Sequence, residues 1–248
     1  MTKIYLSPHL DDAVFSCGGI IFEETSKGEK VEVWTYATAD PLMNELTPFA
    51  RLLHERWGNP AHPVRVRRKE DEKALASLNC AWQHLGFLDC IYRRDELTNE
   101  PLIRLDDDLF SPLEGREKTL IDRMTLATHS LLAHQLPGEM EIYSPLAVGG
   151  HIDHQITRAV AEQLGMPLFY YADFPYAAKT PTTVDNYLPQ GVLEIQEEIS
   201  SHGLAAWQKA IACYKSQISS FWHSSDDMKQ VVENYAGYPA ARTRWKKP

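Results

Sequence analysis

The 248-residue chain has little of what marks several large classes of protein. Its cysteines form no CxxC pair and no zinc-knuckle spacing, so we expect reduced thiols and a cytoplasmic location. They are Cys17, Cys80, Cys90 and Cys213. Apolar runs fall well short of the ~20 residues that a membrane helix needs, so we expect no membrane span. The N-terminal residues contain no apolar segment with a small-residue cleavage site, so we expect no signal peptide.

Positive charge is also scarce. The 25 Lys and Arg residues are outnumbered by 34 Asp and Glu residues, and the formal net charge is -9. Phosphate backbones attract proteins with a surplus of Lys and Arg, so a nucleic acid is not expected as the main partner. The GxGxxG and GxxxxGK[ST] patterns are missing, so the sequence gives no support for a backbone cradle around phosphates.

The order of the apolar segments predicts an α/β fold. Residues 3–7 form a short apolar strand, residues 12–26 a helix that Gly28 ends, and residues 31–36 a second strand. This β-loop-α-β order is typical of a parallel sheet. Further strands are expected at 84–89, 141–146 and 167–171, and further helices at 65–78, 115–134, 153–164 and 204–221. We therefore expect one domain over residues 1–248, with a Rossmann-like, mostly parallel sheet flanked by helices.

Two long segments have no clean period. Residues 39–63 are rich in Pro and Asn, with one short helix expected near 49–56. Residues 92–114 contain three successive aspartates at 106–108, which we expect to lie on a solvated surface. Long insertions of this kind are often lids or substrate loops. The sequence assigns no particular role to residues 92–114.

Two predicted loops carry residue types that bind metals. Each follows a strand and precedes a helix, the position where sites form in open parallel sheets. Residues 7–12 contain His9, Asp11 and Asp12, and residues 149–154 contain His151, Asp153 and His154. An Asp pair after a strand is often only a helix cap, and an isolated HxxH is often incidental. Two such clusters together favour a metal site, because a catalytic zinc takes three protein ligands and leaves one position for water.

Both clusters resemble motifs of one family, the LmbE/PIG-L family of zinc-dependent de-N-acetylases. Residues 8–12 (PHLDD) look like its PHPDD signature, and residues 150–154 (GHIDH) resemble its HxDH motif. Two weaker similarities follow the same order, an RxxE pattern at 67–70 and an LGxxD pattern at 85–89. The resemblance covers roughly residues 1–175. It departs from the pattern at Leu10 and Ala13, neither of which is a ligand position, although the missing acid at 13 could alter support around the ligands.

The resemblance implies a metal site and a mechanism. It implies that His9, Asp12 and His154 hold one zinc ion per chain. Asp11 would act as general base toward the attacking water, and His151 would stabilise the oxyanion together with the metal. Asp153 would orient a histidine. Either His151 or Asp11 would then protonate the leaving amine.

The resemblance also implies a substrate. Arg67 and Asp89 would contact the hydroxyls of an N-acetylglucosamine-type sugar or sugar conjugate, which loses its acyl group. It allows a homo-oligomer. Two other classes stay open: a metal-dependent hydrolase of another bond, such as a phosphoester, and a non-catalytic sugar- or nucleotide-binding module. The first more often needs two metals and basic clamps, and the second has no need of Asp11 beside the ligands.

Overall fold

A computed structural model describes residues 1–58, 61–135, 139–179 and 181–248. Its centre is a seven-stranded sheet with the order β3-β2-β1-β4-β5-β7-β6. The strands are β1 (Thr2–Ser7), β2 (Lys30–Ala37), β3 (Ala81–Phe87), β4 (Met140–Pro145), β5 (Leu168–Tyr171), β6 (Leu193–Gln196) and β7 (Thr243–Lys246). Strands β1 to β5 pair in parallel, whereas β7 is antiparallel to both β5 and β6. The predicted α/β class with a mostly parallel sheet is confirmed.

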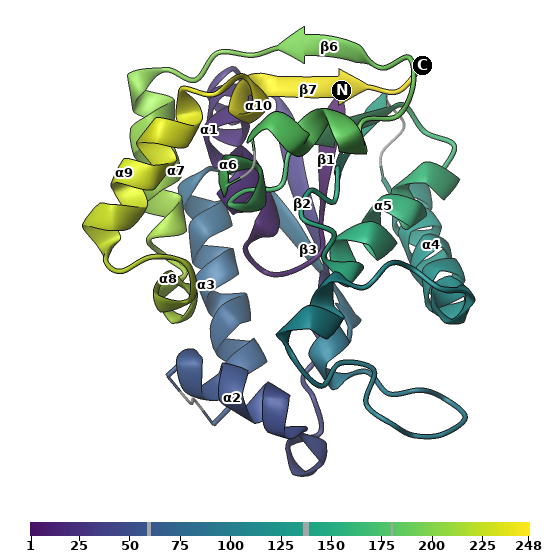
Figure 1. Ribbon diagram of the computed structural model, residues 1–248. Helices are drawn as coiled ribbons and strands as arrows, with labels where there is room; N and C mark the ends of the chain where they lie inside the picture. The colour runs from purple at the N-terminus through teal and green to yellow at the C-terminus, as the bar shows by residue number, and fades with distance from the viewer. Residues whose placement is uncertain (59–60, 136–138, 180) are drawn as a thin grey trace.

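Helices cover both faces of this sheet (Figure 1). They are α1 (Asp12–Ser26), α2 (Pro48–Arg56), α3 (Pro63–Ser77), α4 (Lys118–Ala133), α5 (Ile152–Gln163), α6 (Tyr176–Lys179), α7 (Ser201–Ile211), α8 (Lys215–Phe221), α9 (Ser225–Ala236) and α10 (Pro239–Arg242). Helices α4 and α5 pack together on one side, and α1, α3 and α7 pack together on the other. Within the described ranges, no helix is long and apolar enough to cross a membrane.

The first β-α unit forms as its sequence predicts. The middle of β1 is fully buried, and Gly28, with φ of 81°, takes the left-handed conformation that follows the end of α1. Gly18 lets α7 approach closely, because a Cβ there would lie 2.5 Å from Cδ1 of Trp207. The Trp207 indole donates to the carbonyl of Val14 at 2.8 Å. These contacts fix the start of α1, which carries part of the site.

The predicted helix at 204–221 is wrong in one respect, because it is two helices, α7 and α8. The Tyr214 hydroxyl donates to Oδ1 of the buried Asp71 at 2.7 Å, and the Ser216 amide donates to Glu70 at 2.9 Å. Both acceptors lie on α3, so α8 is held against α3 instead of continuing α7. The strand predicted at 84–89 lies at Ala81–Phe87, which puts Asp89 in the loop after it.

Candidate metal centre

The two predicted metal-type loops lie side by side. Strands β1 and β4 are parallel neighbours, so the loops at their carboxyl ends meet at one edge of the sheet. Asp12 opens α1 and His151 is the N-cap of α5, where its side chain accepts the Asp153 amide. The structure therefore brings all six residues of the two clusters to one place.

Three donor atoms converge between these loops. Oδ2 of Asp12 lies 2.9 Å from Nδ1 of His9 and 3.3 Å from Nε2 of His154. Two ligands of a tetrahedral zinc, each at ~2.0–2.1 Å from the metal, lie roughly 3.3 Å apart. The spacing and the chemistry of this donor set fit a divalent metal such as zinc.

Buried carboxylates pair with the ring nitrogens of His9 and His154 that do not face Asp12. Nδ1 of His154 lies 2.6 Å from Oδ1 of Asp173, and Nε2 of His9 lies 3.0 Å from Oδ2 of Asp153. Asp173 is fixed in turn by the Val148 amide, which donates to its other oxygen at 2.8 Å. A carboxylate on the far nitrogen sets the tautomer of a metal-binding histidine. Here that leaves Nδ1 of His9 and Nε2 of His154 as the ring nitrogens that face Asp12.

Asp173 was not predicted from the sequence. It comes two residues after β5, the parallel neighbour of β4, so its carboxylate reaches the same sheet edge as the two loops. A carboxylate directly after a buried apolar strand was the signal that could have found it.

Further donor groups surround this set. Ligand atoms of His9, His151 and His154 lie within 4.8 Å of one another, as do those of His9, Asp89 and Asp153 and those of Cys90, His151 and Asp153. Nδ1 of His151 accepts the Asp153 amide at 3.3 Å, which leaves the proton of a neutral ring on Nε2. Burial and the neighbouring His9 and His154 rings lower the pKa of His151 well below its usual value. His151 is therefore a neutral hydrogen-bond donor near neutral pH.

Asp11 and Arg67 are buried next to each other beside the centre. Nη2 of Arg67 lies 3.5 Å from each carboxylate oxygen of Asp11, and Nη1 lies 3.9 Å from Oδ2 of Asp89. Burial raises the pKa of Asp11 to about 6, and the Arg67 guanidinium opposes that rise. The Arg67 guanidinium also stacks on the Trp57 ring, 4.8 Å from its centroid. Asp11 is thus a carboxylate near neutral pH with a raised basicity, as a general base requires.

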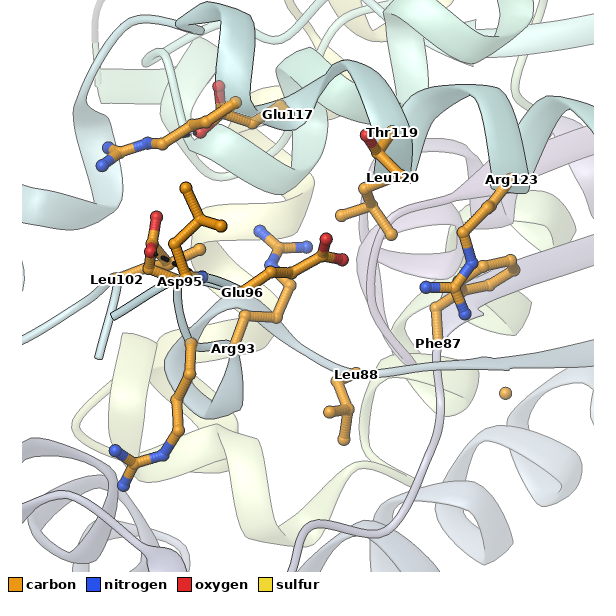
Figure 2. Close-up of a pocket in the computed structure, with 14 residues that line it drawn as sticks. Phe87, Leu88, Arg93, Asp95, Glu96, Leu102, Glu117, Thr119, Leu120 and Arg123 are labelled. Carbon is orange, nitrogen blue, oxygen red and sulfur yellow. Dashed lines mark hydrogen bonds and ion pairs between the residues drawn. The ribbon is translucent and has the colours of Figure 1, made fainter. Parts of the chain in front are cut away.

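A pocket of about 450 Å³ is lined by residues from the end of β3, from the segment after it and from α4 (Figure 2). Its walls include Phe87, Leu88 and Leu120, and none of the predicted metal ligands lines it. Arg93 is the link, because it lines this pocket and places Nη2 2.5 Å from Oδ1 of Asp153. Arg93 therefore holds the carboxylate that in turn holds His9.

Comparison with known proteins identifies the class of this site. The GlcNAc-PI de-N-acetylase family (PIG-L) matches residues 4–164. The chain belongs to this family, and the predicted LmbE/PIG-L resemblance is confirmed. The match includes both metal-type loops and ends before Asp173.

Individual relatives agree with this assignment. The chain is 25% identical over 189 residues to 2'-N-acetylparomamine deacetylase of Niallia circulans, covering 70% of this chain and 66% of the relative. It is 29% identical over 191 residues to the Streptomyces fradiae protein of the same name, covering 71% of this chain and 58% of the relative. The aligned part thus spans about two thirds or less of these curated relatives.

Solved structures match over nearly the whole chain. The zinc-inhibited form of teicoplanin deacetylase Orf2 has a TM-score of 0.81 and 26% identity, covering 99% of this chain and 97% of that one. The A40926 pseudoaglycone deacetylase Dbv21 has a TM-score of 0.77 and 26% identity, covering 98% and 96%. The fold of this chain is therefore the fold of these deacetylases.

Proposed function

We propose that the protein is a zinc-dependent N-deacetylase that removes an acetyl group from the amide nitrogen of an amino sugar or sugar conjugate. The observation that carries the proposal is the convergence of Asp12 Oδ2 with His9 Nδ1 and His154 Nε2, beside the buried base Asp11. The relatives support the substrate class, since their names give deacetylation of 2'-N-acetylparomamine, teicoplanin and A40926 pseudoaglycone.

His9, Asp12 and His154 would hold one zinc ion per chain. A zinc ion bound in this way polarises a carbonyl and makes water acidic enough to react at neutral pH. The chain's own groups do the rest. Asp11 accepts the proton of the attacking water, and Nε2–H of His151 donates to the carbonyl oxygen as negative charge develops on it.

The low pKa of His151 helps to decide which group protonates the leaving amine. A ring that stays neutral is a poor acid but a good hydrogen-bond donor. Asp11, once it has taken the proton from water, is the better acid for the leaving amine. We therefore assign both proton transfers to Asp11 and oxyanion binding to His151.

Arg67 and Asp89 would contact the sugar. Oδ1 of Asp89 accepts a hydrogen bond from the Ile91 amide at 3.2 Å, and Oδ2 of Asp89 lies 3.8 Å from Nε2 of His9. Because Arg67 contacts Asp11 as well, its role extends to the base itself. Arg67→Ala is expected to lower kcat by roughly tenfold or more in addition to raising KM, and steady-state kinetics separates the two effects. Arg65→Ala, an exposed arginine on the same helix, is the matched control and should change neither.

Asp173 supports the metal through His154. Asp173→Asn is expected to weaken zinc affinity by about 10–100-fold, because the amide does not fix the histidine tautomer as a carboxylate does. Competition with a chromogenic chelator measures this affinity. Asp185→Asn, at an exposed aspartate, is the control. Unchanged affinity in Asp173→Asn would contradict the assigned role.

A panel of N-acetylated amino sugars tests the proposed function as a whole. It contains N-acetylglucosamine, its glycosides and N-acetylated aminoglycosides, assayed for amine release with zinc and with chelator. We expect release from at least one class, lost with chelator and restored by zinc. Binding of two metal equivalents with release from phosphoesters would favour a phosphoesterase. Stoichiometric sugar binding with no turnover would favour a binding module.

A further inference from the structure

Phe110 is an exposed aromatic residue placed against the candidate active site. It lies on the 3-10 helix η3 (Asp106–Phe110), within the long segment 92–114, and is 43% exposed. Its ring stands edge-on to His151, with centroids 5.8 Å apart, and 6.2 Å from the ring of Tyr176. The Tyr176 ring lies 5.9 Å from that of His154. Phe110 and Tyr176 therefore form an aromatic wall beside the two histidines of the HxDH motif.

This wall is held in place by the helix that carries the motif. Nε2 of Gln155 on α5 donates to the Ser111 carbonyl at 2.9 Å and to the Gly150 carbonyl at 2.6 Å. Its Oε1 accepts the Leu113 amide at 3.3 Å. One side chain thus ties the segment after Phe110 to the loop that carries His151. The hydrogen bonds of Gln155 therefore fix the segment next to Phe110 against the candidate active site.

Phe110 also lines a pocket of about 460 Å³. Apolar residues make much of the lining, among them Pro112, Leu113 and Leu146, and the ion-paired Arg158 and Glu162 also line it. Gly150 lies in the same lining, one residue before His151. Phe110 therefore lines this pocket and also contacts His151 of the candidate active site.

The direction of the substrate follows from the two walls, and this step rests on the proposed function. Arg67 and Asp89 form the polar wall and suit sugar hydroxyls. His151 would bind the carbonyl oxygen, and the acyl substituent is bonded to that same carbonyl carbon. The amide nitrogen, which bears the sugar, is bonded to that carbon too, so the acyl group and the sugar leave it in different directions. With the sugar toward Arg67, the acyl group is placed toward Phe110, whose ring stands edge-on to His151.

We propose that Phe110 sets the length of acyl chain that the enzyme accepts. With the ring in place, the acyl site ends at Phe110 and fits acetyl. With the ring removed, the site continues into this pocket, and longer acyl chains bury surface against its apolar residues, such as Leu113 and Leu146. Segment 92–114 is thereby assigned as the element of acyl selectivity.

The test compares acetyl, butyryl and hexanoyl derivatives of one amino sugar. Phe110→Ala is expected to raise the hexanoyl-to-acetyl ratio of kcat/KM by at least about tenfold, in line with the selectivity that a few methylenes confer in an apolar site. Phe110→Leu should give a smaller rise, and its milder change protects the test against a folding defect. Leu97→Ala is the matched control, because Leu97 is an apolar, 96% exposed residue of the same segment that does not line this pocket. Its ratio should equal that of the wild type.

The outcomes separate the two claims. Amine release by the wild type with an unchanged ratio in both Phe110 variants overturns the acyl assignment and leaves the deacetylase proposal standing. No release from any acyl derivative by the wild type, with zinc present, overturns the proposed function and this inference with it. A shift toward longer chains in both variants, graded with side-chain size, supports it.

Discussion

Replacing His154 with alanine is expected to remove bound zinc and amine release together. Nε2 of His154 is one of three converging donors, so its loss leaves His9 and Asp12 as a two-ligand site. The zinc contribution to an amide hydrolysis amounts to several kcal/mol, which corresponds to a fall in kcat/KM of at least about a thousandfold. Zinc content of the purified protein and amine release are measured on the same sample.

A second effect of this variant separates it from a simple loss of metal. Asp173 is buried against His154. Removal of the His154 imidazole therefore leaves the Asp173 carboxylate with one hydrogen-bond partner fewer. An uncompensated buried carboxylate is destabilising, so we expect a lower thermal midpoint as well. His129→Ala, at an exposed histidine of α4, controls for histidine removal. Full zinc content in His154→Ala would show that the ligand assignment is wrong.

The Asp11→Asn variant is expected to separate metal binding from chemistry. The amide has nearly the shape of the carboxylate but does not accept a proton, so kcat should fall by about 10²–10⁴. Zinc content should stay at the wild-type value, because the metal donors belong to His9, Asp12 and His154. The neighbouring Asp12 gives the contrast, since Asp12→Asn should lower zinc content and kcat together.

A matched control for Asp11→Asn is Asp40→Asn, because Asp40 is an exposed aspartate whose carboxylate pairs with Arg68 at 2.8 Å. It should keep both zinc and turnover. Wild-type turnover in Asp11→Asn would remove Asp11 as the base. Loss of zinc in that variant would instead give Asp11 a place among the metal ligands.

The sequence predicts the parts of the fold that local patterns control. The first strand, the helix at Asp12–Ser26 and its glycine stop follow from apolar runs and a left-handed Gly28. Both metal-type loops are found for the same reason, since each lies directly after a buried strand. The two loops lie close together because β1 pairs with β4 in parallel. The α/β class is compatible with this pairing, but no local sequence pattern predicts it.

Other features depend on contacts across the chain and could not be predicted. The break at Tyr214 comes from its hydrogen bond to Asp71 on α3. Strand β6 is exposed throughout, so it shows no buried pattern to detect. The place of Phe110 depends on the Gln155 tether, which no spacing rule indicates.

The antiparallel strand β7 has a consequence for the durability of the metal centre. It pairs with β5 on the side away from β4, so β5 is an interior strand and not an edge. Asp173 leaves the end of β5 and fixes His154. An edge strand can fray, whereas a strand bonded on both sides opens only with much of the sheet. Segments beyond residue 164 therefore stabilise, from outside, a site whose proposed ligands all lie within residues 4–164, the part that matches the family.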